Sequence, residues 1–407
     1  MLNKAAFTER KFLVVLAFVT SLFLLWGIAI TMGDVLNKHF QNILKVSKSQ
    51  SGLVQFSIFG AYAVMGIPAG LFMQRFGYKR GVQLGLGLYA LGAFLFIPAA
   101  GEASFPFFRF ALFVLACGLA TLETVAHPFV AALGDQRTSD QRINFAQAFN
   151  GLGCTLGPLI GGYFLLRASH SNDENLESVT TLYTVIGLFI TALALIFSFV
   201  KIPALAPHHE PHGSQEADGV IAAPKKLFQR RHFKWAVAAQ FFNVAAQGGT
   251  WAYFINYGVE KIPGMTDEKA AYYFSFSMFL MMVGRFISTF LMRFVRPNIL
   301  LSLYAAVNAL LCIVIAQNLG WTSFIALMLL NFFLSIMFPT IFSLGLKDLG
   351  ADTQKGSSYI VMGVVGGALF PPVMGLIANH NIAAAYYLPI LCYAVIFLFG
   401  WKFYKSY

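Results

Sequence analysis

Long apolar runs separated by short polar segments fill the chain from residue 11 to residue 404. Most runs reach about 20 residues, which is the length that a helix needs to cross the hydrocarbon core of a bilayer. A backbone in lipid must satisfy its own hydrogen bonds, so each run is predicted to be helical. The pattern predicts an all-α integral membrane protein with twelve transmembrane helices, at residues 11–36, 51–74, 80–100, 106–133, 143–167, 179–201, 233–258, 270–292, 298–317, 321–346, 356–379 and 383–404.

A polar segment interrupts this pattern after the sixth run. It contains the sequence PHHEPHGSQEADG followed by basic residues, which is typical of a solvated linker. The prediction is an N-terminal six-helix bundle at 1–201, a cytoplasmic linker at 202–232 and a C-terminal six-helix bundle at 233–407. We expect no metal site in the linker, because no cysteine or carboxylate lies at ligand spacing from its histidines, His208, His209 and His212.

The two halves repeat one another. Pro128 is followed by Gly134 at the end of the fourth run, and Pro339 is followed by Gly345 at the end of the tenth. The two prolines are 211 residues apart, and so are the two glycines. The repeat indicates duplicated bundles, an arrangement that places a substrate site near the middle of the membrane, between halves that rock about it.

Composition and charge support a membrane location. The chain is 58% hydrophobic and 11% charged, whereas soluble domains are about 25% charged. We attribute the net charge of +11 to lysines and arginines in the cytoplasmic loops of a membrane protein, and not to a surface that binds nucleic acid. With both termini in the cytoplasm, 20 lysines and arginines fall in inside segments and 7 in outside segments, as the positive-inside rule requires.

The most unusual chemistry lies in the fourth run. Glu123 sits in an apolar segment, where an ionisable side chain costs about 2.5–3.5 kcal/mol and is usually functional. His127 follows four residues later on the same helical face. Burial disfavours the charged form of a carboxylate, so Glu123 is a candidate proton carrier. The alternative is a structural carboxylate bound to His127 or to Arg285.

Gly70–Arg80, with the sequence GLFMQRFGYKR, resembles the loop signature of the major facilitator superfamily, although Gln74 replaces the usual aspartate. A longer set of segments resembles the fucose–proton symporter family. The resemblance implies a proton-coupled monosaccharide carrier of the bacterial inner membrane, with Asp34 and Glu123 as the key acidic pair. The matching segments are WGIAITMGDVLNKHFQ, LETVAHPFVAALG, FAQAFNGLG, residues 235–266, FPTIFSLGLKDLG and GSSYIVMGVVGG.

The chain departs from that family at several positions where the family is expected to carry polar side chains. The expected cavity is therefore less polar, and glucose, galactose and mannose are candidate substrates beside fucose. The positions are Ile30, Thr31, Gly33, His127, Met337 and Phe338.

Six further side chains are candidates for binding the sugar. Amides both donate to and accept from hydroxyls, and aromatic rings pack on the apolar face of a sugar. The alternative for each is contact between helices or core packing. The candidates are Gln147, Asn150, Gln247, Trp251, Asn256 and Phe338.

Two of the three proton-coupling candidates, Glu123, Asp34 and His127, have further structural alternatives. Asp34 lies near the predicted end of the first helix, where it could instead form an exposed pair with Lys38 of little energetic value. His127 could relay a proton, or it could be a core histidine that donates to a backbone carbonyl.

The predicted function is proton-coupled uptake of a hexose by alternating access, without catalysis. H⁺ is the coupling ion, and no cofactor, metal or nucleic-acid partner is expected, because no phosphate-binding loop or nucleophile–base pair occurs. The expected partners are the sugar, the proton and the lipid bilayer, with the protein acting as a monomer. The alternatives are a sugar uniporter, a sodium-coupled carrier, a proton-driven exporter and a sugar sensor.

Overall fold

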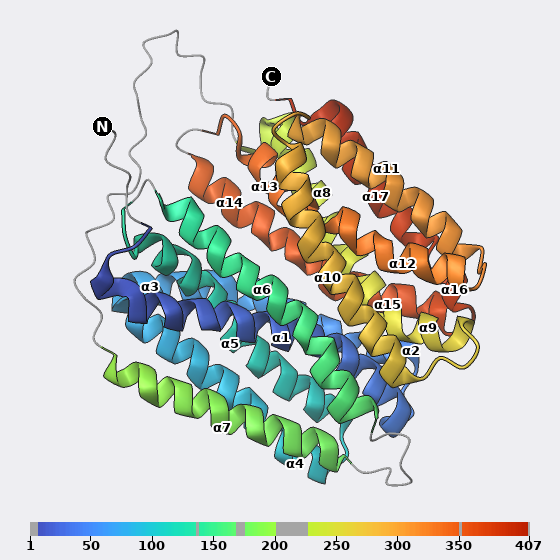
Figure 1. Ribbon diagram of the computed structural model, residues 1–407, viewed down its shortest axis with the longest axis horizontal. Helices are drawn as coiled ribbons and strands as arrows, with labels where there is room; N and C mark the ends of the chain where they lie inside the picture. The colour runs from blue at the N-terminus through green and yellow to red at the C-terminus, as the bar shows by residue number, and fades with distance from the viewer. Residues whose placement is uncertain (1–6, 136–137, 168–175, 201–226, 350–351, 406–407) are drawn as a thin grey trace. The chain divides into compact units, whose positions relative to one another are not determined.

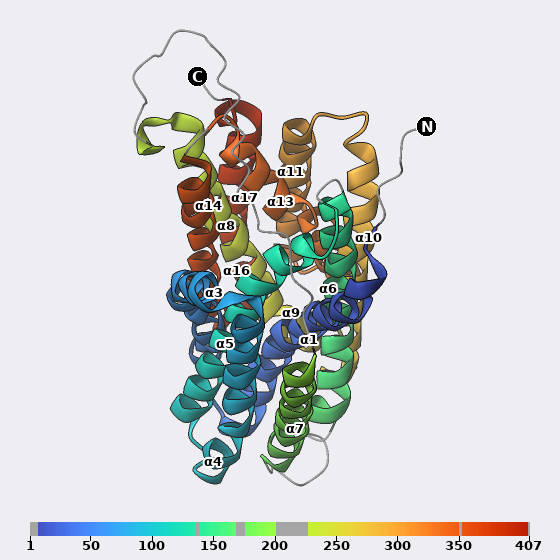
Figure 2. The same cartoon turned by 90° about the vertical axis from the view of Figure 1, so that its left-hand side faces the viewer.

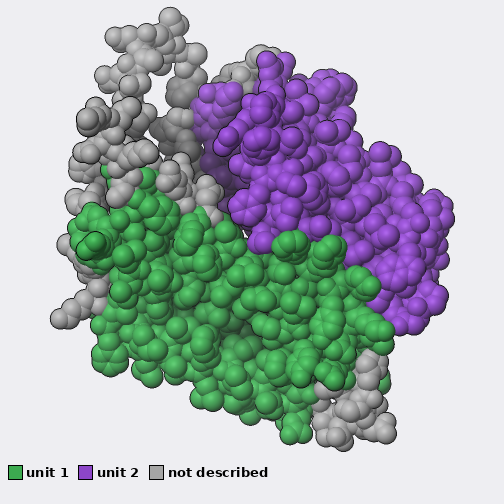
Figure 3. All heavy atoms as spheres, in the orientation of Figure 1, with its two compact units in different colours: residues 1–208, 266–279 green, residues 209–265, 280–407 purple. Residues whose placement is uncertain are grey.

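The computed structural model describes residues 7–135, 138–167, 176–200, 227–349 and 352–405. All regular elements within these residues are helical. The chain divides into two compact units (Figure 3), one of residues 1–208 and 266–279 and one of residues 209–265 and 280–407. The linker histidines and residues 201–226 lie outside the described residues, and the predicted bundle boundaries at 201 and 233 stay a prediction.

The first unit is built from long apolar helices that lie side by side (Figure 1). α3 packs along α5 and α7, and α1 packs along α6. Figure 2 shows α3 and α5 again as neighbours. The elements are η1 (Arg10–Phe12), α1 (Leu13–Leu44), α2 (Lys48–Ser51), α3 (Leu53–Phe94), α4 (Phe96–Gly101), α5 (Phe105–Ala132), α6 (Ser139–Gly161), η3 (Gly162–Leu166) and α7 (Glu177–Phe199).

The second unit is also built from helices that pack against one another. α8 packs against α13, α15 and α17, and α11 packs against α12 and α17. α10 begins in the first unit and ends in the second. The elements are η5 (Leu227–Gln229), α8 (Arg231–Ala252), α9 (Phe254–Lys261), α10 (Asp267–Leu291), α11 (Pro297–Ala316), α12 (Trp321–Leu334), α13 (Met337–Leu346), α14 (Thr353–Met362), η7 (Gly363–Val365), α15 (Gly366–Ala378), α16 (Ile382–Ala385), α17 (Leu388–Leu398) and η8 (Phe399–Phe403).

Ten helical stretches of the described residues are long and apolar enough to cross a membrane. One of them, Lys48–Gly101, contains the two predicted spans 51–74 and 80–100. The predicted span 233–258 is formed by α8 and α9, and α8 is less apolar because it carries several amides. Every predicted span therefore coincides with helix in the described part of the chain.

A glycine turn divides α3 between its two spans. Gly77 has φ 81° and ψ 170°, a conformation that side-chain-bearing residues rarely adopt. A Cβ at this position would meet open space, so only the backbone requires glycine here. This turn lies within Gly70–Arg80, the segment whose sequence resembles a family loop signature.

We expect Gly77→Ala to lower the free energy of unfolding by about 1–3 kcal/mol, because alanine strains this backbone conformation. Thermal unfolding in detergent measures the change. Gly87→Ala is the matched control, since Gly87 lies in the same helix, also in open space, but without a positive φ. That control is expected to gain about 0.5–1 kcal/mol. A similar loss in both variants would contradict the backbone explanation.

Glycines bring α1 and α6 into direct backbone contact. A Cβ built on Gly27 would lie 2.3 Å from the carbonyl oxygen of Asn150, and one on Gly153 would lie 2.1 Å from that of Leu24. The second unit has a comparable contact, where a Cβ on Gly366 would lie 2.0 Å from the carbonyl oxygen of Phe241. Small residues at such contacts allow membrane helices to approach closely.

A buried arginine holds the turn between α5 and α6. Arg142 is fully buried, and its guanidinium donates to the carbonyl oxygens of Val130 (3.0 Å), Ala131 (2.5 Å) and Asp135 (3.1 Å). It also donates to the carbonyl oxygen of Phe7, at 2.9 Å. The last carbonyls of a helix lack intrahelical donors, so this side chain caps the end of α5 and fastens the N-terminal segment to it.

Candidate functional site

Glu123 lines a small pocket in the first unit. Leu22, Phe23 and Trp26 of α1 form one wall, and Glu123 lies with Leu122 and Ala126 on α5. Among the described residues, no ion pair includes Glu123. The carboxylate is therefore placed among apolar side chains without a counter-charge in the described part of the chain.

His127 lies one helical turn beyond Glu123 and contacts it through the backbone. Nδ1 of the ring is 2.9 Å from the carbonyl oxygen of Glu123, and Nε2 is 2.7 Å from Nε2 of Gln147. The ring of Phe23 packs edge-on against the imidazole, with 5.0 Å between centroids. The structure thus brings together three of the predicted residues, Glu123, His127 and Gln147. His127 contacts the backbone oxygen of Glu123 and not its carboxylate.

Two aromatic side chains that the sequence analysis did not select extend this cluster. The indole N–H of Trp26 donates to the hydroxyl of Tyr62, which lies near enough to Glu123 for an electrostatic interaction. Trp26 also lines the pocket of Glu123. Aromatic residues make up 16% of the chain, so sequence alone gave no signal that set these two apart.

Asp34 lies inside α1 and not at its end. α1 continues to Leu44, beyond the predicted end at residue 36. Asp34 is 5% exposed, and Lys38 contacts Asp267 at 3.6 Å. The alternative of an exposed Asp34–Lys38 pair is therefore wrong, because this part of α1 is buried.

The partner of Asp34 is the amide of Gln55 in α3, which donates to its carboxylate oxygen Oδ1. Gln55 is 2% exposed. The sequence analysis did not select it, although an amide inside an apolar run is a recognisable signal.

We expect Gln55→Leu to lower the free energy of unfolding by about 1–3 kcal/mol, because it leaves a buried carboxylate without this donor. Replacing both partners, Gln55→Leu with Asp34→Leu, should recover most of that loss, since no polar atom is then left unpaired. Thermal unfolding in detergent distinguishes the variants. Gln83→Leu is the control, because Gln83 lies in the same helix and bonds to Ser198 at the surface. Additive losses in the double variant would rule out a direct pair.

Asn150 connects two helices. Its amide nitrogen donates to the carbonyl oxygen of Phe23 at 3.3 Å, and the side chain is 8% exposed. This contact lies beside the glycine seam, which we define as the backbone contact of α1 and α6 around Gly27 and Gly153. Of the two predicted amides of α6, Gln147 is the more exposed.

The second unit holds the four remaining candidates. Trp251 is 4% exposed and donates its indole N–H to Oδ1 of Asn331 at 2.7 Å, and Asn256 is 1% exposed. Gln247 of α8 is partly exposed and Phe338 of α13 is 37% exposed. α8 and α13 pack against each other, and Gln247 and Phe338 are the more accessible two.

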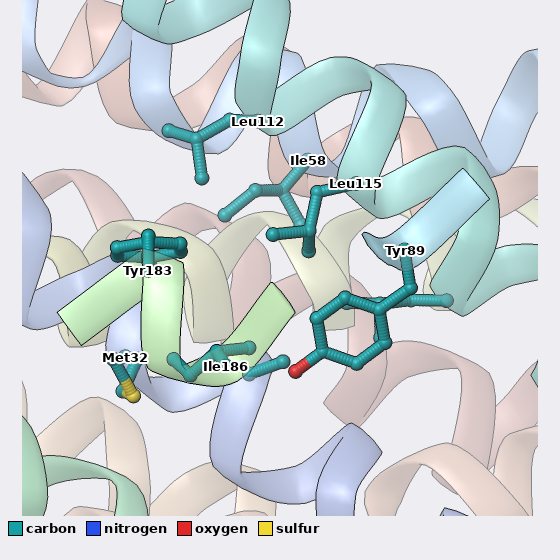
Figure 4. A pocket seen from close by; sticks show the side chains of 9 residues that line it. Met32, Ile58, Tyr89, Leu112, Leu115, Tyr183 and Ile186 are labelled. Carbon is teal, nitrogen blue, oxygen red and sulfur yellow. The ribbon is translucent and has the colours of Figure 1, made fainter. Parts of the chain in front are cut away.

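A further cavity of the first unit has an apolar lining (Figure 4). Met32, Ile58, Tyr89 and Tyr183 point into it with other apolar side chains. Its space, like that of the Glu123 pocket, is about that of one water molecule, so neither holds a monosaccharide in this structure. Among the described residues, no group of three histidine, cysteine, aspartate or glutamate side chains is arranged to hold a metal ion.

Comparison with known proteins identifies the family. The family model described as Major Facilitator Superfamily matches residues 12–358. The chain belongs to the Major Facilitator Superfamily. The resemblance drawn from the sequence motifs is confirmed.

Other members of the superfamily resemble the chain over nearly its whole length. The L-fucose-proton symporter of Escherichia coli (strain K12) is 39% identical, over 98% of this chain and 95% of that protein. The glucose/galactose transporter of Brucella abortus (biovar 1, strain 9-941) is 34% identical, over 97% and 95% respectively. These relatives are named for different sugars.

Solved structures support the same superfamily fold. The crystal structure of the transporter FucP in the outward conformation has a TM-score of 0.68 and 38% identity, over 98% of this chain and 100% of that chain. The crystal structure of a D-xylose-proton symporter has a TM-score of 0.75 with 14% identity, over 97% and 98%, which supports the fold alone. The predicted twelve-helix, all-α membrane fold is confirmed.

Proposed function

We propose that the chain is a proton-coupled monosaccharide carrier, not an enzyme, that works by alternating access. The observation that carries the proposal is Glu123, a carboxylate without a counter-charge in the described residues that lies in a pocket with Trp26. The backbone oxygen of Glu123 contacts His127, which in turn contacts the amide of Gln147. A carboxylate there can take up and release a proton, while amide and aromatic side chains suit a sugar.

Glu123 is the proton site of the proposed cycle, with Asp34 as the second acidic residue. Protonation removes a buried charge and so lowers the cost of closing the cavity around a bound sugar. Release of the proton on the side of lower proton activity then favours release of the sugar. Coupling of this kind is reciprocal, so the sugar also raises the affinity for the proton.

The substrate class is a hexose. The similarity to a protein named L-fucose-proton symporter and to one named glucose/galactose transporter supports this class. In the first unit we assign Gln147 and Asn150 to sugar binding. In the second unit we assign Gln247 and Phe338, with Trp251 and Asn256 supporting them from its interior. We propose that the protein is a monomer of the bacterial inner membrane with both termini in the cytoplasm. The distribution of lysine and arginine supports this orientation of the termini.

Uptake of radiolabelled glucose into proteoliposomes tests the proposal, with fucose, galactose and mannose as competitors. Uptake is compared under an inward proton gradient, an inward sodium gradient and no gradient. Accumulation driven only by the proton gradient supports the proposal. Equilibration without accumulation would make the chain a uniporter, accumulation with sodium alone would make it a sodium-coupled carrier, and no movement of any monosaccharide would sink the proposed function.

A further inference from the structure

The ring of His127 is held in one orientation by three neighbours. A carbonyl oxygen only accepts hydrogen bonds, so Nδ1, at 2.9 Å from the carbonyl oxygen of Glu123, carries the proton. In a neutral imidazole the other nitrogen is then an acceptor. The edge-on packing of Phe23 against the ring, at 5.0 Å, restricts its rotation.

This tautomer decides how Gln147 is oriented. Nε2 of His127 accepts, so the group 2.7 Å away must be the NH₂ end of the Gln147 amide. The oxygen Oε1 of Gln147 then points elsewhere, and it accepts no hydrogen bond from the residues that the structure describes. Because the side chain is partly exposed, Oε1 is the atom that is available to a ligand.

We propose that His127 is a positioning residue that fixes the Gln147 amide so that its oxygen, and not its nitrogen, meets the sugar. The inference rests on the proposed sugar-carrier function and adds a specificity rule to it. Oε1 is an acceptor only, so one hydroxyl of the sugar must act as the donor. A ligand that presents only an acceptor at that position leaves both oxygen and ligand unpaired, which lowers affinity.

Deoxy and deoxyfluoro glucoses distinguish an acceptor from a donor in the site. Replacing a hydroxyl by hydrogen removes both functions, whereas fluorine cannot donate but retains a weak acceptor. At one ring position we expect the deoxy and fluoro analogues to lose affinity equally, by about tenfold, as competitors of glucose counterflow. In His127→Leu the amide is free to turn its NH₂ toward the sugar, so the fluoro analogue should recover severalfold relative to the deoxy analogue.

Two more variants sharpen the test. His127→Gln can place a side-chain oxygen near the position of Nε2 and should restore the native pattern of equal losses. His232→Leu is the matched control, because His232 is a buried histidine at the start of α8 whose Nε2 contacts the carbonyl oxygen of Lys347 at 3.0 Å. A fluoro-to-deoxy affinity ratio that is the same in the native chain and in His127→Leu would overturn the proposal.

The tautomer of His127 can also be measured in the native chain, so this test does not require His127→Leu to fold. The ¹⁵N chemical shifts of the His127 ring, assigned by comparison with His127→Gln, should show a protonated Nδ1 and an unprotonated Nε2. A protonated Nε2 would overturn the inference while leaving sugar transport intact. Failure of the native chain to exchange any monosaccharide would instead overturn the proposed function and with it the specificity rule.

Discussion

Glu123→Gln is expected to abolish gradient-driven accumulation of sugar while counterflow exchange survives. Glutamine has nearly the shape of a protonated glutamate, so it suits the pocket formed by Phe23, Trp26 and Leu122. It cannot release a proton, so the imposed gradient no longer drives the cycle. Exchange of sugar for sugar needs no net proton movement and should persist.

The size of the effect follows from the gradient. With one proton per sugar, a gradient of one pH unit supplies about 1.4 kcal/mol, which supports about tenfold accumulation. The variant should reach only the external concentration. Glu102→Gln is the control, since Glu102 is exposed at the end of α4. Unchanged accumulation in Glu123→Gln would contradict its role as the proton site and would direct attention to Asp34.

Arg142→Ala is expected to cause the largest loss of stability, about 3 kcal/mol or more, because each buried acceptor left without a donor costs about 1–3 kcal/mol. The carbonyl oxygens of Val130 and Ala131 belong to the last turn of α5 and would lose the guanidinium as a donor, although Val130 keeps the bond from the backbone N–H of Leu133. The N-terminal segment would also lose the bond to Phe7. Thermal unfolding in detergent measures the loss.

Two substitutions separate the hydrogen bonds of Arg142 from its charge. Arg142→Lys keeps the charge but lacks the planar fork of donors, so most of the loss should remain. Arg167→Ala removes an exposed arginine that lies over the ring of Tyr163, and we expect little change. Equal destabilisation by Arg142→Ala and Arg167→Ala would show that the buried bonds contribute little.

The helices could be predicted from the sequence because lipid leaves few alternatives to an apolar helix. The main error lies at the end of α1. Lys38 and Asn42 look like the start of a polar loop, but both contact Asp267, which is more than two hundred residues away in the chain. A long-range partner of this kind has no signature in the local pattern.

Part of the candidate site could also be predicted from the sequence. The spacing of Glu123 and His127 placed both on one face of a helix, and Gln147 stood out as an amide at the start of an apolar run. The sequence did not predict which atoms of these residues are in contact. A spacing of four residues allows His127 to bond either to the backbone oxygen of Glu123 or to its carboxylate. The amide of Gln55 inside an apolar run was visible in the sequence, but its bond to Asp34 was not predictable because Asp34 lies on another helix.

The glycine seam has a consequence for protein engineering. A side chain larger than hydrogen at Gly27 or Gly153 would collide with backbone atoms of the opposite helix, so a directed-evolution library that randomises these positions would consist mostly of misfolded clones. Gln147 lies on α6, as Gly153 does, but outside these backbone contacts. A library aimed at a new sugar would therefore yield more folded clones if it varied Gln147 and His127 together and kept the glycines fixed.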